Sequence, residues 1–130
     1  MTARTLLDTH TFLWFITGNE RLSGQAREVL ADREGAMLIS VASLWEIAIK
    51  YGLGKLTLDR PFESLIPGEL ERQRIGTLGI SADHLSELVR LPLHHRDPFD
   101  RLIVAQALSE GVPVISADPA FDPYGVQRIW

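Results

Sequence analysis

The order of its apolar segments constrains the fold of this chain more than any other feature. Short apolar runs at residues 4–8, 36–40, 112–116 and 126–130 have the length and flanking residues of buried strands. Longer segments between them repeat apolar residues at helical spacing. Strands that alternate with helices pair in parallel, and helices cover both faces of such a sheet. The sequence therefore predicts an α/β fold.

Capping residues mark where the helices begin and end. Asp97 and Pro98 precede an apolar segment that Gly111 ends, which is the usual order of N-cap, first-turn proline and terminal glycine. Ser81 is a similar start signal for a shorter helix. The expected helices cover residues 9–16, 23–33, 41–51, 69–74, 81–90 and 98–110, a further strand covers 75–80, and 55–67 is expected to be irregular.

Length and composition fit one compact domain over residues 1–130. The 130 residues are 45% hydrophobic and 23% charged, as in ordinary globular proteins. Asp8 interrupts the first apolar stretch after two leucines, so neither a signal-peptide core nor a membrane span can be drawn there. We expect a cytoplasmic protein with no membrane association. Because the chain has no cysteine, any bound metal must be held by oxygen or imidazole.

Acidic residues stand where the expected strands and helices meet. Asp8 and Asp118 each follow an apolar strand, Glu46 lies one helical turn beyond another, and Asp100 lies in the first turn of a helix. The carboxyl ends of parallel strands share one edge of the sheet, where α/β proteins bind ligands. Clustered carboxylates repel one another, and Mg²⁺ compensates because it prefers hard oxygen ligands. Such a site suits phosphodiester hydrolysis by a metal-activated water, with one or two ions.

Most of these carboxylates also have a purely structural explanation. The structural alternatives are a helix cap for Asp8 and for Asp97, an ion pair of Glu46 with Lys50 on a solvated face, and a turn at Asp118. Asp100 is harder to explain this way, because the helix around it is almost entirely apolar. Their shared position at one sheet edge favours the functional interpretation.

Histidines and aromatic residues are expected to contribute mainly to structure. We set His94 and His95 aside as metal ligands, since adjacent side chains rarely point into one site and no HExxH spacing exists. Trp45 lies on an apolar helical stripe and is expected in the core. Trp14 and Phe15 could belong to the core, a partner surface or a base-stacking platform.

The formal net charge of -4 does not decide whether nucleic acid is a partner. An acidic protein ordinarily binds phosphates poorly. Acidic residues gathered in a metal pocket would, however, be neutralised by cations, and the arginines outside that pocket would be free to bind phosphates.

Several segments resemble a known protein family. They are LLDTHTFLW (6–14), SVASLWEIAIKYGLGKL (40–56), LPLHHRDPFDRLIVAQAL (91–108) and ISADPAFDPYGV (115–126). Together they closely resemble the PIN-domain ribonucleases, in particular the VapC-type toxins of bacterial toxin–antitoxin pairs. The resemblance implies a three-layer α/β/α sandwich with a central, mainly parallel sheet. It also implies a Mg²⁺- or Mn²⁺-dependent endoribonuclease that cuts single-stranded or structured RNA, forms a homodimer and binds a VapB-like antitoxin.

The resemblance also assigns residues. The acidic positions of the family match Asp8, Glu46, Asp100 and Asp118, which are therefore the expected catalytic and metal-binding residues. Asp97 is expected near the metal, and Asp122 is an alternative to Asp118 because the fourth position varies most in the family. Substrate contacts are expected from His10, Ser116 and Arg101.

Other functions fit the same pattern. A housekeeping RNA-processing nuclease of PIN type would need no antitoxin, and a catalytically silent PIN-like domain would only bind. A receiver-like domain that holds one Mg²⁺ for phosphorylation needs an acidic pair near the first strand, where this chain offers only Asp8.

Overall fold

A five-stranded sheet forms the centre of the computed structural model, which describes residues 3–130. Met1 and Thr2, part of the expected domain, lie outside the described residues. The strand order is β3-β2-β1-β4-β5 and every neighbouring pair is parallel, so the prediction of a mainly parallel sheet is confirmed. The strands are β1 (Arg4–Leu7), β2 (Ala36–Ser40), β3 (Ile75–Leu78), β4 (Val114–Ile115) and β5 (Arg128–Ile129).

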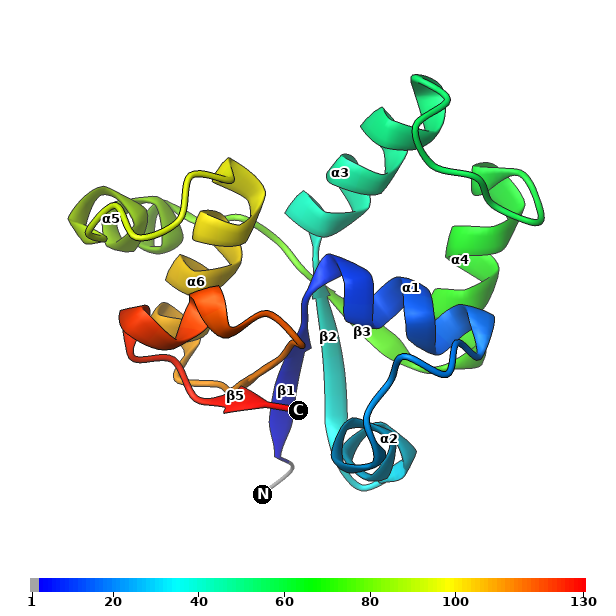
Figure 1. Ribbon diagram of the computed structural model, residues 1–130, viewed down its shortest axis with the longest axis horizontal. Coiled ribbons are helices and arrows are strands. Elements are labelled where there is room, and N and C mark those ends of the chain that lie inside the picture. The colour runs from blue at the N-terminus through cyan, green and yellow to red at the C-terminus, as the bar shows by residue number, and fades with distance from the viewer. Residues whose placement is uncertain (1–2) are drawn as a thin grey trace.

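Helices cover both faces of this sheet. Figure 1 shows α5 and α6 on one side of the strands and α1, α2 and α4 on the other, which is the expected three-layer sandwich. The helices are α1 (Thr9–Thr17), α2 (Gly24–Ala31), α3 (Val41–Gly52), α4 (Phe62–Arg72), α5 (Ala82–Arg90) and α6 (Pro98–Glu110), with a 3₁₀ helix η1 (Pro119–Tyr124).

Alternating side chains of β1 give the sheet a hydrophobic core on each face. Leu6 and Leu7 are both fully buried, but successive strand residues point to opposite faces. Leu7 packs in the cluster that contains Phe12 of α1, whereas Leu6 packs in the cluster that contains Ile103 of α6. A strand that is apolar on both sides is thus explained by helices on both sides.

The predicted capping residues act as expected. Asp97 accepts hydrogen bonds from the backbone at the start of α6, and Gly111 ends that helix with a φ of 67°, a conformation that favours glycine. Ser23 caps α2, and Ser81 forms a reciprocal capping box with His84 at the start of α5. The observed bounds of α6 match the prediction, since both ends carry strong local signals.

Two predictions about local structure were wrong in part. Residues 55–67 were expected to be irregular, but α4 begins at Phe62 and continues through Pro67. The helix tolerates this proline because Leu65 and Ile66 bury its apolar face against the sheet. The predicted strand over 112–116 is shorter than expected, because Pro113 has no N–H to donate and β4 begins after it.

Trp45 is 59% exposed, so the prediction that it lies in the core was wrong. The buried face of α3 carries Ala42, Glu46 and Ile47, a stripe rotated by about one residue from the apolar pattern. That rotation turns Glu46 inward and leaves Trp45 outside, with its ring centroid 5.4 Å from that of Phe99 in an edge-to-face arrangement.

Within residues 3–130, we find no helix with both the length and the apolar character needed to cross a bilayer.

Candidate active site

Asp8 lies at the point where the strand order reverses, because β1 pairs with both β2 and β4. In open α/β sheets this point is where ligands bind. Asp8 caps α1, with Oδ1 accepting from the backbone N–H of Thr11 (2.8 Å) and Oδ2 accepting from the Ser116 hydroxyl (2.6 Å). The residue is only 5% exposed. Burial raises the pKa of Asp8, although the bonds from Ser116 and Thr11 oppose the rise.

Ser116 and Asp118 follow β4 at the same edge of the sheet. Ser116 is fully buried, and its hydroxyl oxygen also accepts the backbone N–H of Asp118 at 3.0 Å. Asp118 caps η1, with Oδ1 accepting from the Ala120 N–H at 2.9 Å. Ser116, which we expected at the substrate, therefore positions Asp8 and the turn that carries Asp118.

Asp100 comes from the first turn of α6. Its pKa is raised to about 7, chiefly by burial and next by the negative charge of Asp97, with smaller effects of Asp8 and Glu46. The Asp97 carboxylate caps the helix, accepting from the N–H groups of Phe99 (2.8 Å) and Asp100 (3.2 Å). The charges of Asp8 and Glu46 reach Asp100, and Asp8 lines the same cavity as Asp118, so these acidic residues lie in one region.

His95 lies between two of these carboxylates. Its Nε2 is 3.1 Å from Asp100 Oδ2 and 3.6 Å from Asp118 Oδ2. Nδ1 accepts the Asp97 N–H at 3.1 Å, so a neutral ring carries its proton on Nε2 and donates it toward Asp100. The His94 ring packs instead against Tyr124, with the two ring centroids 5.1 Å apart.

Of the two histidines that we set aside as metal ligands, only His95 therefore lies beside the predicted metal-binding carboxylates. Adjacent side chains do diverge, but only one of the two had to reach the carboxylates. The Asp97 cap was a partial signal, because it fixes the start of α6 and the backbone N–H of Asp97 donates to His95 Nδ1.

Glu46 reaches the region from α3 and is 4% exposed. Its Oε1 accepts from the Thr9 hydroxyl at 2.8 Å, and its Oε2 accepts from Lys50 Nζ at 2.7 Å. The pair with Lys50 thus exists, but Glu46 is on a buried face and not on a solvated one. The hydrogen bond to Glu46 raises the pKa of Lys50, and the charges of Asp97 and Asp100 add to the rise.

Of the remaining predicted site residues, only His10 lies beside the acidic residues, whereas Asp122 and Arg101 are paired elsewhere. Asp122 is exposed and paired with Arg128 (Oδ1 to Nε, 2.8 Å), which lowers its pKa, so Asp118 is the one beside His95. Arg101 donates to the Pro92 carbonyl (2.9 Å) and contacts the Tyr124 hydroxyl (3.3 Å), so it fixes the loop that carries His95. His10 is exposed and lines a cavity of about 260 Å³ beside Asp8.

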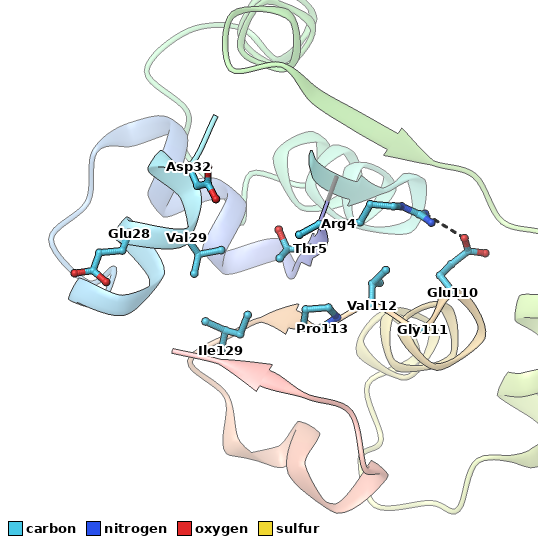
Figure 2. Close-up of a pocket in the computed structure, with 11 residues that line it drawn as sticks. Arg4, Thr5, Glu28, Val29, Asp32, Glu110, Gly111, Val112, Pro113 and Ile129 are labelled. Atoms are coloured by element: carbon cyan, nitrogen blue, oxygen red, sulfur yellow. Dashed lines mark hydrogen bonds and ion pairs between the residues drawn. The ribbon is translucent and has the colours of Figure 1, made fainter. Parts of the chain in front are cut away.

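A larger cavity, about 680 Å³, lies at the opposite edge of the sheet. Figure 2 shows Arg4 of β1 and Glu110 of α6 pointing toward each other there, joined at 3.1 Å. Arg4 begins β1 whereas Asp8 follows its end, so this cavity is separated from the acidic cluster by the length of the strand.

The donor set suits a divalent cation. One ligand atom from each of His95, Asp100 and Asp118 lies within 4.8 Å of the others, and Nε2 of His95 would bind a cation only without the proton that it donates toward Asp100. Carboxylate oxygens dominate the set, as Mg²⁺ and Mn²⁺ prefer. Burial and like charge raise the pKa of Asp100, and a cation among these oxygens would relieve that repulsion. The residues present therefore fit the expected metal.

Comparison with known proteins extends the resemblance noted in the sequence. Ribonuclease VapC16 of Mycobacterium tuberculosis is 42% identical over 60 residues, which cover 46% of this chain and 41% of that protein. VapBC2 from Rickettsia felis, solved with a DNA fragment from its promoter, superposes with a TM-score of 0.73 at 19% identity over 96% of both chains. Mycobacterium tuberculosis VapC20, a sarcin–ricin loop cleaving toxin, superposes at 0.62 with 16% identity, covering 94% of this chain and 95% of that one.

The match over most of the chain comes from a family model. The model for the PIN domain matches residues 5–126, a range that includes every acidic residue described above. The chain therefore belongs to the PIN-domain family.

Proposed function

We propose that this protein is a Mg²⁺- or Mn²⁺-dependent endoribonuclease and the toxin of a toxin–antitoxin pair. The observation that carries the proposal is the convergence of Asp8, Glu46, Asp100 and Asp118 at the switch point of the sheet, where Asp100 has a pKa of about 7. The identity to ribonuclease VapC16 supports the same activity.

In this proposal Asp8, Asp100 and Asp118 hold the cation, with Glu46 and Asp97 beside them. Bound there, the ion supplies positive charge for the attacked phosphate and the leaving oxygen. The reaction is hydrolysis, so a P–O bond breaks with water as the nucleophile and no protein nucleophile is needed.

Neighbouring side chains orient the carboxylates of this site and offset part of their negative charge. Ser116 and the Thr11 N–H hold both oxygens of Asp8, so its carboxylate has a fixed direction. Lys50 offsets the charge of Glu46, and His95 holds a proton at Nε2 against Asp100. A site whose donors are fixed before substrate arrives pays little for reorganisation during reaction.

Single-stranded or structured RNA is the proposed substrate. It follows from the PIN resemblance and accords with VapC20, described as cleaving the sarcin–ricin loop. A VapB-like antitoxin and a second copy of the chain are the proposed partners, and a cytoplasmic location stays a prediction. An exposed apolar row on α3, formed by Val41, Trp45, Ile49 and the cap residue Leu53, supports a protein partner.

Cleavage of labelled RNAs by purified, antitoxin-free protein tests the activity. Cutting should require Mn²⁺ or Mg²⁺, stop in EDTA, and fall by at least about a hundredfold in Asp8→Asn and Asp100→Asn. Asp83→Asn, an exposed position on α5, is the matched control. No cutting together with no metal binding by calorimetry would instead favour a silent binding module.

The toxin role needs separate experiments. Induced expression should arrest growth, and co-expression with the adjacent small gene should yield a complex that co-purifies under native conditions. A cutting enzyme that neither arrests growth nor retains a partner would be a housekeeping RNA-processing nuclease.

A further inference from the structure

The cavity beside Asp8 has two chemically different walls. It has a volume of about 260 Å³ and is lined by Asp8, His10, Trp14, Arg21, Ala117 and Asp118. One wall carries the two carboxylates assigned above to the metal. The other is aromatic and basic, and comes from α1 and the segment that follows it. Neither Trp14 nor Arg21 has a role in the proposed metal chemistry.

The aromatic wall is built before any ligand binds. His10 and Trp14 are four residues apart on α1, so they share one helix face, and their ring centroids are 5.8 Å apart at 39°. Trp14 is half-buried against the core, and the centroid of its ring lies 5.8 Å from that of Trp130. A ring held in this way loses little side-chain entropy when it stacks on a ligand.

Arg21 adds a positive charge to this wall. Its guanidinium carbon lies 5.9 Å from the centroid of the Trp14 ring, within the range of a cation–π contact. The group is exposed and faces the same cavity as Asp8 and Asp118. With a cation on Asp8 and Asp118, as proposed above, Arg21 and the Trp14 ring suit an anionic ligand that carries a flat ring.

Helix α1 couples the two walls. Asp8 caps this helix, and Trp14 lies six residues further, about 9 Å along the axis. A phosphate at the carboxylate-bound metal would therefore be within one nucleotide's reach of the Trp14 ring. The volume is somewhat below the roughly 300–1,000 Å³ of pockets that take drug-sized ligands, which suits one base.

We propose that this cavity is a nucleobase subsite of the nuclease. It stacks the base of a nucleotide next to the scissile phosphate on Trp14, while Arg21 binds a neighbouring backbone phosphate. Unpaired bases of RNA are commonly recognised by stacking on aromatic rings and arginine planes, and stacking tolerates every base. The subsite would therefore raise affinity for single-stranded RNA more than it would select a sequence. The proposal rests on the proposed ribonuclease function.

Binding can be measured apart from cleavage. Fluorescence anisotropy of a short labelled single-stranded RNA, in Mg²⁺ and on an Asp100→Asn background, reports affinity without turnover. Trp14→Ala should raise Kd on the order of tenfold, whereas Trp14→Phe should keep most of the affinity because it keeps a stacking face. Trp45→Ala is the matched control, because it removes an exposed tryptophan that does not line this cavity, and it should bind RNA as its parent does.

Arg21→Gln gives a second and independent measurement. Losing one phosphate contact should weaken binding and reduce the slope of log Kd against log salt by about 0.7. Arg33→Gln, at an exposed arginine outside this cavity, should change neither. Thermal melts of each variant identify loss of folding, and Arg21→Gln remains informative if Trp14→Ala is unstable.

An abasic scan of the RNA separates stacking from general disruption. Removing the base at the position bound by Trp14 should weaken binding to the parent, but should cost little more in the Trp14→Ala protein, since both changes remove the same contact. Fully additive losses would overturn the proposal.

The other outcomes are also decisive. If Trp14→Ala and Arg21→Gln bind RNA like their parent, the subsite is wrong while metal-dependent cleavage by the unsubstituted protein still supports the nuclease. If they keep RNA binding but lose the co-expressed antitoxin, the cavity is a protein-binding site and the proposal fails. If the unsubstituted protein neither binds nor cuts RNA, the proposed function and the subsite fail together.

Discussion

Ser116 joins the ends of two neighbouring strands by donating a 2.6 Å hydrogen bond to Asp8 across 108 positions of the chain. The same hydroxyl accepts the backbone N–H of Asp118. A single buried group therefore sets the direction of one predicted metal ligand and the position of another.

Replacing that hydroxyl should affect both stability and activity. Ser116→Ala leaves the buried Asp8 carboxylate short of one donor, so the free energy of unfolding should fall by about 1–3 kcal/mol and cleavage by about tenfold. Urea unfolding and initial cleavage rates measure the two effects. Ser109→Ala, at an exposed serine of α6, is the control. Equal behaviour of the two variants would show that the bond has no such role.

Asp100 should make the metal-free protein less stable as the pH rises. Its pKa is about 7 in the folded protein, against an ordinary value of 3.8, so between these values the folded state binds more protons than the unfolded state. The stabilisation is complete below about pH 4 and is lost as the pH approaches and passes 7. Asp8, whose pKa is also raised, adds to the trend in the same direction.

Thermal melts in EDTA at pH 5 and pH 8 test this sign. Asp100→Asn should melt about 3 °C higher than the unsubstituted protein at pH 8 and should show a smaller loss between the two pH values. Asp83→Asn should retain the full loss. An undiminished pH dependence in Asp100→Asn would assign the effect to other groups.

Mn²⁺ affinity should show whether Asp118 or Asp122 is the fourth acidic metal ligand. Mn²⁺ binding followed by calorimetry should weaken by about tenfold or more in Asp118→Asn, because a ligand is lost. Asp122→Asn should bind normally, since Asp122 is paired with Arg128. The opposite pattern would assign the fourth acidic position to Asp122.

Lys50 should stabilise the fold through its ion pair with Glu46. In Lys50→Met the buried Glu46 carboxylate loses its 2.7 Å cationic partner, so the protein should be destabilised by about 1 kcal/mol, a modest value because Lys50 is 45% exposed. The double variant with Glu46→Gln should recover part of that loss, as chemical denaturation would reveal. Lys55→Met, at an exposed position beyond the helix, should be neutral. Failure of the double variant to recover stability would mean that the lysine acts elsewhere.

The sequence predicted best where local signals were strong. Asp97, Pro98 and Gly111 define both ends of α6, and the strand that ends before Asp8 needed only its apolar run. Helix α4 was partly missed because Pro67 is a helix breaker by local preference, while the packing of Ile66 that outweighs it is tertiary.

The candidate site was predictable in outline but not in its contacts. Asp8, Asp97 and Asp118 each cap a helix and also lie in the acidic cluster, so the structural and functional explanations were never alternatives. The place of His95 depends on a loop held by Arg101 and Tyr124, and the exposure of Trp45 depends on the rotation of α3. Neither the position of His95 nor the exposure of Trp45 can be predicted from the local spacing of residues.

The short strand β4 has a consequence for how the protein opens. Only Val114 and Ile115 pair in it, so apart from the packing of these two buried side chains it is joined to the neighbouring strands by a few backbone hydrogen bonds, among them the one from Asp8 N–H to the Ile115 carbonyl. Local unfolding of residues 112–130 would carry away Ser116 and Asp118 while β1, β2 and β3 stay paired. Amide exchange in this segment would then be faster than in β2, and the proposed nuclease activity would be lost at denaturant concentrations that leave most of the fold intact.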